Sequence, residues 1–132
     1  MRYVASILVI ALTLSIFYFS WIPNPNIGSA SYFPEEIGTW INNYGNLRTA
    51  VPFFILGGVF ELFFVKDIDK NKKRILILFG LFLTVTFAEF GQLFLANRHF
   101  DLWDIFWGTV GSLAGMILAV IGKRIVRKRK QY

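Results

Sequence analysis

The sequence predicts an all-α polytopic membrane protein with four transmembrane helices. Of its 132 residues, 55% are hydrophobic and 18% are aromatic. A soluble domain of this size would not expose so much apolar surface without aggregating. The apolar residues form four runs, each close in length to the ~20 residues that a helix needs to span a bilayer. These runs cover residues 3–22, 47–65, 75–96 and 104–122 of one domain, residues 1–132.

The basic residues flank these runs. Of the 14 Lys and Arg residues, five lie in residues 66–74 and six in residues 123–130, whereas the 23–46 connection has none. Because cytoplasmic loops of membrane proteins are rich in Lys and Arg, we expect both termini in the cytoplasm and the 97–103 turn on the outer side. The net charge of +6 then reflects topology, and we expect no nucleic-acid partner.

The composition also limits the chemistry of any site. The chain has no Cys and one His, so it offers no thiolate metal site, no thiol nucleophile and no disulfide. We therefore expect neither a metal nor a cofactor, and a binding protein is favoured over an enzyme.

The first run, residues 3–22, is followed by Pro23 and Pro25, which stop a helix. A cleaved signal peptide is the alternative, because Gly28-Ser29-Ala30 offers small residues for cleavage. The run is long for that role and has only Arg2 in front of it. We predict a retained span.

The 23–46 connection contains a predicted amphipathic helix. Its large apolar residues fall at helical spacing on one side, and a helix of this kind lies flat on a membrane surface. A partly ordered loop is the alternative. The apolar residues are Phe33, Ile37, Trp40, Ile41 and Tyr44.

The second span carries Arg48 at its start and Glu61 near its end. Glu61 either snorkels to or pairs with Lys at the 66–74 end, or it has a functional role, and we favour the first interpretation. The third span, residues 75–96, and the fourth, residues 104–122, are joined by a tight turn. A basic tail, residues 123–132, follows.

Charged groups beside an apolar helix are costly, so each one in residues 89–104 is a candidate for function. Glu89 lies ~10 Å below Ala96 along its helix, and its expected partner is Arg98, Arg48 or a proton. Asp104 is expected to cap the fourth span. The candidate ligand-binding residues are Glu89, Gln92, Arg98, Asp101 and Asp104, followed by Arg48 and His99.

The fourth span also carries a stripe of small residues that includes Gly108, Gly111 and Gly115. Such stripes let helices approach closely in lipid. The stripe would pack on the third span, or it would form the face of a homo-oligomer.

These residues resemble the pattern of the VanZ-like family of bacterial membrane proteins. The matching elements are Glu89-x-x-Gln92-x-Phe94, Arg98-x-x-Asp101-x-x-Asp104 and Gly111-x-x-x-Gly115. The chain departs from the pattern at Gly108, where the family usually has Asn, and at Asn46-Leu47-Arg48-Thr49, where it often has Lys-x-x-His. The resemblance implies a bacterial cytoplasmic (inner) membrane protein, and the founding member is associated with low-level resistance to teicoplanin, a lipid-tailed glycopeptide.

Three hypotheses for function follow. The first is a non-enzymatic protein that binds an anionic or amphipathic ligand at the outer leaflet: a glycopeptide, a cell-wall lipid precursor or a phospholipid headgroup. The second is a small hydrolase or transferase acting on a lipid-linked substrate, with His99 and the nearby carboxylates holding a metal or acting as a general base. The third is a structural or partner-binding protein, in which the charged cluster is an ion-pair network that includes a Glu89–Arg98 pair.

Overall fold

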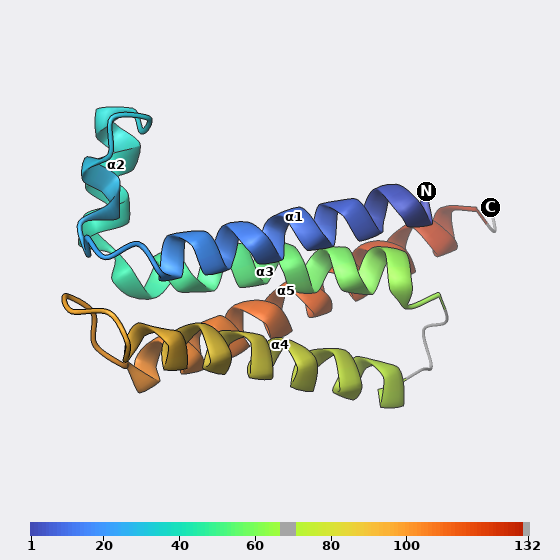
Figure 1. The fold of residues 1–132 in the computed structure, drawn as a ribbon. Helices are drawn as coiled ribbons and strands as arrows, with labels where there is room; N and C mark the ends of the chain where they lie inside the picture. Colours follow the sequence, from blue (N-terminus) through green and yellow to red (C-terminus); the bar gives the residue numbers. More distant parts are fainter. Residues whose placement is uncertain (67–70, 131–132) are drawn as a thin grey trace.

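The regular secondary structure is all helical, without strands, over residues 1–66 and 71–130, which a computed structural model describes (Figure 1). Four helices are long and apolar enough to cross a membrane, as the sequence predicts. In chain order the elements are α1 Arg2–Ser20, the 3-10 helix η1 Ile27–Ser29, α2 Glu35–Asn43, α3 Gly45–Phe64, α4 Asn71–Gln92 and α5 Leu102–Arg129.

The bounds of the last two spans differ from those predicted. The α4 helix begins at Asn71 and ends at Gln92, and the next residues form tight turns in which the Leu93 and Leu95 amides donate to carbonyls three residues back. The α5 helix continues through the basic segment to Arg129, because Lys and Arg are good helix formers and favour the negative end of the helix dipole. The predicted charged turn, residues 66–74, lies partly outside the described residues.

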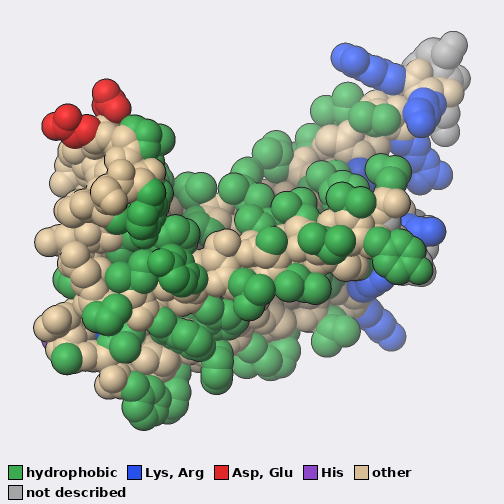
Figure 2. All heavy atoms as spheres, turned by 45° about the horizontal axis from the view of Figure 1, so that its top comes forward, with side chains coloured by type: hydrophobic (Ala, Val, Ile, Leu, Met, Phe, Trp, Pro, Cys, Tyr) green, Lys and Arg blue, Asp and Glu red, His purple; other side chains and the backbone are tan. Residues whose placement is uncertain are grey.

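The outer flanks of the bundle are apolar. Figure 2 shows hydrophobic side chains covering the long helices, with basic side chains gathered at the end opposite α2. Many of the large hydrophobic side chains are more than half exposed. A surface of this kind has to be covered, and for four bundled helices of spanning length the cover is lipid. Examples are Leu14, Ile75, Phe87 and Leu118.

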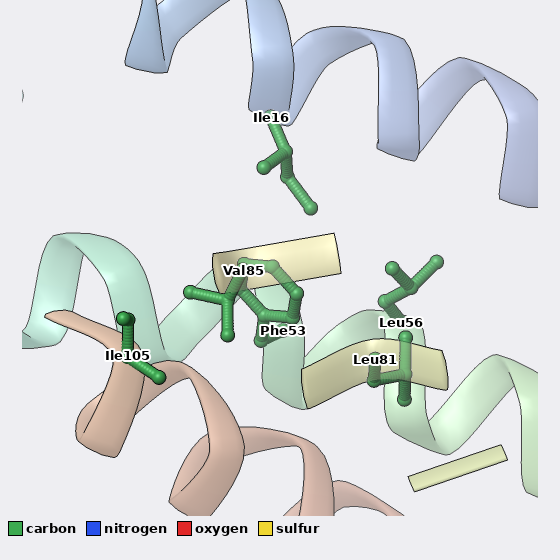
Figure 3. Close-up of a cluster of buried hydrophobic side chains, with 6 residues drawn as sticks. All are labelled: Ile16, Phe53, Leu56, Leu81, Val85 and Ile105. Carbon is green, nitrogen blue, oxygen red and sulfur yellow. The ribbon is translucent and has the colours of Figure 1, made fainter. Parts of the chain in front are cut away.

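The four long helices share one hydrophobic core. Ile16 of α1 points toward Phe53 of α3 and Val85 of α4 (Figure 3). Leu56 and Val85 are each only 1% exposed, and Ile105 brings α5 into the same cluster. Each helix therefore supplies at least one side chain to the interior.

The closest helix pair is α3 and α5. A Cβ at Gly111 would meet the carbonyl oxygen of Ala50, and one at Gly115 would meet the carbonyl oxygen of Phe54. The small-residue stripe therefore packs on the second span, and the prediction that it packs on the third is wrong for these two glycines. The face suggested for a homo-oligomer is covered by α3 of the same chain. Packing backbone against backbone needs two facing surfaces without side chains, and the Gly57-Gly58 pair supplies the second.

The predicted helix in the 23–46 connection is present as α2, which runs across the long axis of the bundle (Figure 1). The η1 turn folds back on it. The Gly28 amide donates to Asn42 Oδ1 at 3.0 Å, and the backbones of Gly28 and Gly38 are in contact. A helix with this orientation lies parallel to the surface of a membrane that the bundle spans.

Glu61 is paired rather than free, as favoured from the sequence. Its carboxylate is fully buried and accepts from Arg74 at 2.8 Å and 3.0 Å and from Lys123 Nζ at 2.6 Å. Lys123 Nζ also donates to the Val65 carbonyl at 2.8 Å. The partners come from α4 and α5 instead of the adjacent Lys66, so the cluster joins three helices at the basic end of the bundle.

Candidate functional site

A cavity of about 350 Å³ lies at the end of the bundle that carries α2. Its walls are apolar side chains of α1, α2 and α3, including Ile16, Trp40 and Ile55. Polar side chains line it where α3, α4 and the following turn meet. These polar residues are Arg48, Thr49, Glu89, Gln92, Arg98 and Asp104, with Ser15 and Ser20 of α1.

Five of the seven candidate residues from the sequence line this cavity: Arg48, Glu89, Gln92, Arg98 and Asp104. Helix periodicity accounts for part of this grouping, because Glu89 and Gln92 are three residues apart on one face of α4. Asp101 and His99 are exposed and do not line the cavity.

Asp101, and not Asp104, caps α5. Its Oδ1 accepts from the Trp103 amide at 2.8 Å, which satisfies one of the N–H groups left free at a helix start. Asp104 lies in the first turn, and its Oδ1 accepts from Thr49 Oγ1 of α3 at 3.0 Å. The predicted cap at Asp104 is thus corrected: an inward-facing carboxyl can bond α3, and Asp101 is left to cap the helix.

Arg98 holds the end of α1. Its Nε donates to the Ile22 carbonyl at 2.9 Å, and its Nη2 donates to the Phe19 carbonyl at 3.2 Å. The last carbonyls of a helix lack partners within it and favour a cation. Burial lowers the pKa of the Arg98 guanidinium, and the charge of nearby Arg48 adds to this shift.

Glu89 is 3% exposed and has neutral partners. Its oxygens accept from Gln92 Nε2 at 3.2 Å and from the Asp101 amide at 3.1 Å, and its carboxyl is within hydrogen-bonding reach of the Asp104 carboxyl. Within residues 1–66 and 71–130, the ion pairs join Glu61 to Arg74 and Lys123. The Glu89–Arg98 pair expected in the structural hypothesis is therefore not formed.

Arg48 is the more accessible of the two arginines. It is half-buried, and its Nη1 makes one long hydrogen bond, 3.4 Å, to the Pro25 carbonyl. Its other guanidinium N–H groups have no acceptor among the described residues and can bind a ligand.

The described part of the chain holds no group of three or more His, Cys, Asp or Glu side chains that could bind a metal. His99 is an exposed turn residue and does not line the cavity that Glu89 and Asp104 line. The residues present therefore do not form the His99-centred metal site of the enzyme hypothesis.

A sequence model of the family described as VanZ/LLP1 matches residues 4–123. The chain belongs to the VanZ-like family. The match extends into all four spans and includes every residue of the cavity. No curated protein and no solved structure matches the chain.

The structure gives a physical meaning to one departure from the VanZ-like pattern. Gly108 stands where the family usually has Asn, and a Cβ there would lie 2.8 Å from Val85 Cγ2 and 3.4 Å from Phe53 Cδ2. In this VanZ-like chain, Val85 fills the space that a larger side chain at position 108 would need. Gly108 is thus a packing position facing α4 and not part of the cavity.

Sequence reasoning missed three polar residues of this VanZ-like cavity, Ser15, Ser20 and Thr49, of which Thr49 contacts a candidate residue. Thr49 stands where the family often has His, one position after Arg48, and it contacts Asp104 directly. The signal was available, because Thr49 falls one turn before Phe53 on the face of α3 that packs inward. The apolar walls were missed for a different reason, since they are ordinary span residues.

Proposed function

We propose that this VanZ-like protein binds an amphipathic ligand with an anionic headgroup at the outer leaflet of the bacterial cytoplasmic membrane. The observation that carries the proposal is the composition of the cavity. Apolar walls from α1, α2 and α3 suit a hydrocarbon chain, and two arginines, Arg48 and Arg98, suit a phosphate or carboxylate. Arg is well suited to such groups because its planar fork donates two hydrogen bonds at once.

The orientation is part of the proposal. Both chain termini lie at the end of the bundle opposite α2 (Figure 1), and basic side chains gather at that end (Figure 2). By the positive-inside rule, that end faces the cytoplasm. The cavity then faces the outer side, where cell-wall lipid precursors and antibiotics are encountered.

The α2 helix supports a membrane-facing site. Trp40 and Ile41 line the cavity, while Ile37 and Tyr44 of the same helix are about half exposed. An amphipathic helix at the interface buries such residues among lipid headgroups and acyl chains. It would therefore hold the cavity at the depth of the headgroups.

The size of the cavity limits the ligand. At about 350 Å³ it is at the small end of ligand sites in proteins. A lipid headgroup with part of one chain fits this volume, whereas a whole glycopeptide does not. For a teicoplanin-like antibiotic, the cavity would hold the lipid tail. The protein would then give tolerance to teicoplanin but not to vancomycin, which has no such tail.

The test is antibiotic susceptibility in a sensitive Gram-positive host that expresses the chain. We expect protection against teicoplanin but not vancomycin, and we expect Arg48→Ala and Glu89→Gln to abolish it. Arg124→Ala, an exposed arginine of α5 far from the cavity, is the matched control. Equal membrane levels of all variants are confirmed by immunoblotting.

Protection that persists in both cavity variants would overturn the role of the cavity. A direct measurement stands beside the cell assay: native mass spectrometry of the purified protein with its co-purified lipids. If no lipid or antibiotic stays bound to the parent chain while the protein is folded, the binding function is wrong.

The contacts of Arg98 favour one second candidate. One of its donors binds the Phe19 carbonyl of α1 and another binds the Ile22 carbonyl just after that helix, so the polar cluster also holds the end of the first helix. A protein whose cluster only fastens helices would work through a partner in the membrane. For such a protein, protection or partner binding would persist in Arg48→Ala and would be lost only in variants that fail to fold.

A further inference from the structure

We infer that the cavity selects a zwitterionic lipid headgroup, one that carries a primary ammonium beside its phosphate, with the ammonium at Glu89 and Asp104 and the phosphate at Arg48 and Arg98. The inference rests on the proposed function and narrows it from an anionic amphiphile to one headgroup class. Phosphatidylethanolamine is the simplest lipid of that class.

The acidic half of the site has no cation within ion-pair distance among the described residues, and Arg48 and Arg98 act on it only from farther away. The carboxyls of Glu89 and Asp104 lie within hydrogen-bonding reach of each other. Their protein donors are all neutral: Gln92 Nε2, the Asp101 amide and Thr49 Oγ1. Two carboxyls this close repel unless a proton or a cation lies between them. A primary ammonium has three N–H donors, so one such group can bond both carboxyls.

The basic half of the site lacks an anion. Arg98 is 91% buried, from its exposed fraction of 9%, and only its Nε and Nη2 have acceptors within the described chain. It lies near enough to Arg48 for the two positive charges to interact. No buried side-chain nitrogen of the described residues lacks a partner, so Arg98 Nη1, which has no acceptor among those residues, is not fully buried, and Arg98 lines the cavity. A phosphate between the two guanidinium groups would relieve their repulsion.

The two arginines and two carboxyls of the cavity balance in charge, and a headgroup that carries both an anion and a cation keeps that balance. Two arginines face two carboxyls without forming an ion pair with them, which leaves one site for an anion and one for a cation. An anionic lipid such as phosphatidylglycerol would bind the arginines but would supply no cation to the carboxyl pair. A choline headgroup carries its charge on a quaternary nitrogen and has no N–H to donate.

The chain of the lipid has a path into the bilayer. Val51 and Ile55 of α3 line the cavity and are also 41% and 45% exposed on the flank of the bundle. Leu12 and Ile16 of α1 line the same cavity. A single alkyl chain can therefore leave between α1 and α3 without crossing a polar surface.

The experiment measures binding of three lysolipids with the same acyl chain to the purified full-length protein in detergent. Lysophosphatidylethanolamine, lysophosphatidylglycerol and lysophosphatidylcholine are titrated separately and followed by native mass spectrometry. We expect the ethanolamine lipid to bind at least tenfold more tightly than either of the others. A fourth titration with free phosphoethanolamine separates a lipid from a soluble ligand, and we expect it to bind far more weakly.

The variants assign the preference to the carboxyl pair. Asp104→Asn is expected to reduce the ethanolamine preference to less than threefold while glycerol-lipid binding is kept or increased. Glu36→Gln, which removes an exposed carboxylate on α2, is the control and should change nothing. If Asp104→Asn does not fold, as judged by circular dichroism and size-exclusion chromatography, the ranking of headgroups by the parent chain decides.

The outcomes separate this inference from the proposed function. Equal or tighter binding of the glycerol lipid overturns the zwitterionic headgroup and leaves an anionic amphiphile site. A preference that survives in folded Asp104→Asn overturns the role of the carboxyl pair. Tight binding of free phosphoethanolamine replaces the lipid by a soluble ligand, and no binding of any probe overturns the proposed function itself.

Discussion

The Arg98 guanidinium donates to the Ile22 carbonyl at 2.9 Å, so the turn between the last two helices holds the end of the first. A second bond from the same side chain reaches the Phe19 carbonyl at 3.2 Å. Arg98 thus caps α1 from outside, a role that sequence-local capping residues fill in most helices. Because Arg98 also lines the cavity, one side chain contributes both to the fold and to the proposed binding site.

Replacing Arg98 should destabilise the protein. In Arg98→Ala, the carbonyls of Phe19 and Ile22 lose their donor, and removing a hydrogen-bonding charged side chain of this kind costs about 1.5–3 kcal/mol. We expect the free energy of unfolding in detergent to fall by about that amount for the pair, measured by thermal unfolding followed with circular dichroism. Arg124→Ala is the control, and an equal melting temperature in both variants would contradict the capping role.

Removing the Glu61 carboxylate should cost more. In Glu61→Ala, Arg74 and Lys123 lose their shared anion, and breaking a buried ion pair from one side costs about 3–5 kcal/mol. We expect the melting temperature to fall by more than in Arg98→Ala, or the protein to fail to accumulate in the membrane. Glu36→Ala on the exposed surface of α2 is the matched control. A change no larger than that of Glu36→Ala would show that the cluster contributes nothing to stability.

Adding a methyl group at the α3–α5 contact should also destabilise. In Gly115→Ala, the new Cβ would meet the Phe54 carbonyl and the Gly58 amide nitrogen, both of which are backbone and cannot rotate away. Overpacking of this kind costs about 1–3 kcal/mol. Gly80→Ala, where nothing lies within 4 Å of the new Cβ, is the comparison and should be neutral or slightly stabilising. Equal unfolding curves for the two variants would argue against close packing at Gly115.

The predicted topology can be tested directly because the chain has no Cys. Single-cysteine variants are labelled in intact cells with a membrane-impermeant maleimide. Glu36→Cys on α2 should react from outside, and Arg129→Cys at the end of α5 should react only after permeabilisation. The reverse pattern would place the cavity on the cytoplasmic side and would remove the outer-leaflet site.

Much of the fold follows from properties that are local in the sequence. The four spans were predicted because hydrophobicity and length act on each helix separately. The α2 helix was predicted from the spacing of residues such as Ile37 and Trp40, which is set by the 3.6-residue period. The predicted end of the third span at residue 96 is wrong, because hydropathy does not distinguish the helix that ends at Gln92 from the apolar turn that follows it.

The convergence of the site was predicted, but its contacts were not. Glu89, Gln92 and Asp104 could be grouped because they flank one short turn. The partners of Arg98 could not be predicted, because they are backbone carbonyls. Every residue has one, so the residue types around Phe19 do not reveal the contact. Opposite charge favoured a Glu89–Arg98 pair, and the unpaired end of a helix dipole proved the stronger partner for a buried guanidinium.

The sequence also did not determine which helix packs against the glycine stripe of α5. A stripe of glycines on α5 indicates that some helix approaches closely, and it does not say which one. The matching small residues on α3, Gly57 and Gly58, were visible in the sequence. Pairing the two would have required weighing small residues on both helices together rather than assuming that consecutive helices pack.

The contact between α3 and α5 sets the order in which the bundle can be completed during synthesis. Glu61 and Lys123 are 62 residues apart, and α4 is made between them. When α3 first reaches the membrane, its glycine surface and the Glu61 carboxylate have no partner from α5. The second span therefore lacks its main packing partner until α5 has been synthesised and inserted. A truncation before α5 would therefore remove more than one helix: it would leave the glycine surface of α3 uncovered and Glu61 without Lys123, held only by Arg74 of α4. Membrane quality-control proteases are suited to recognise such a state.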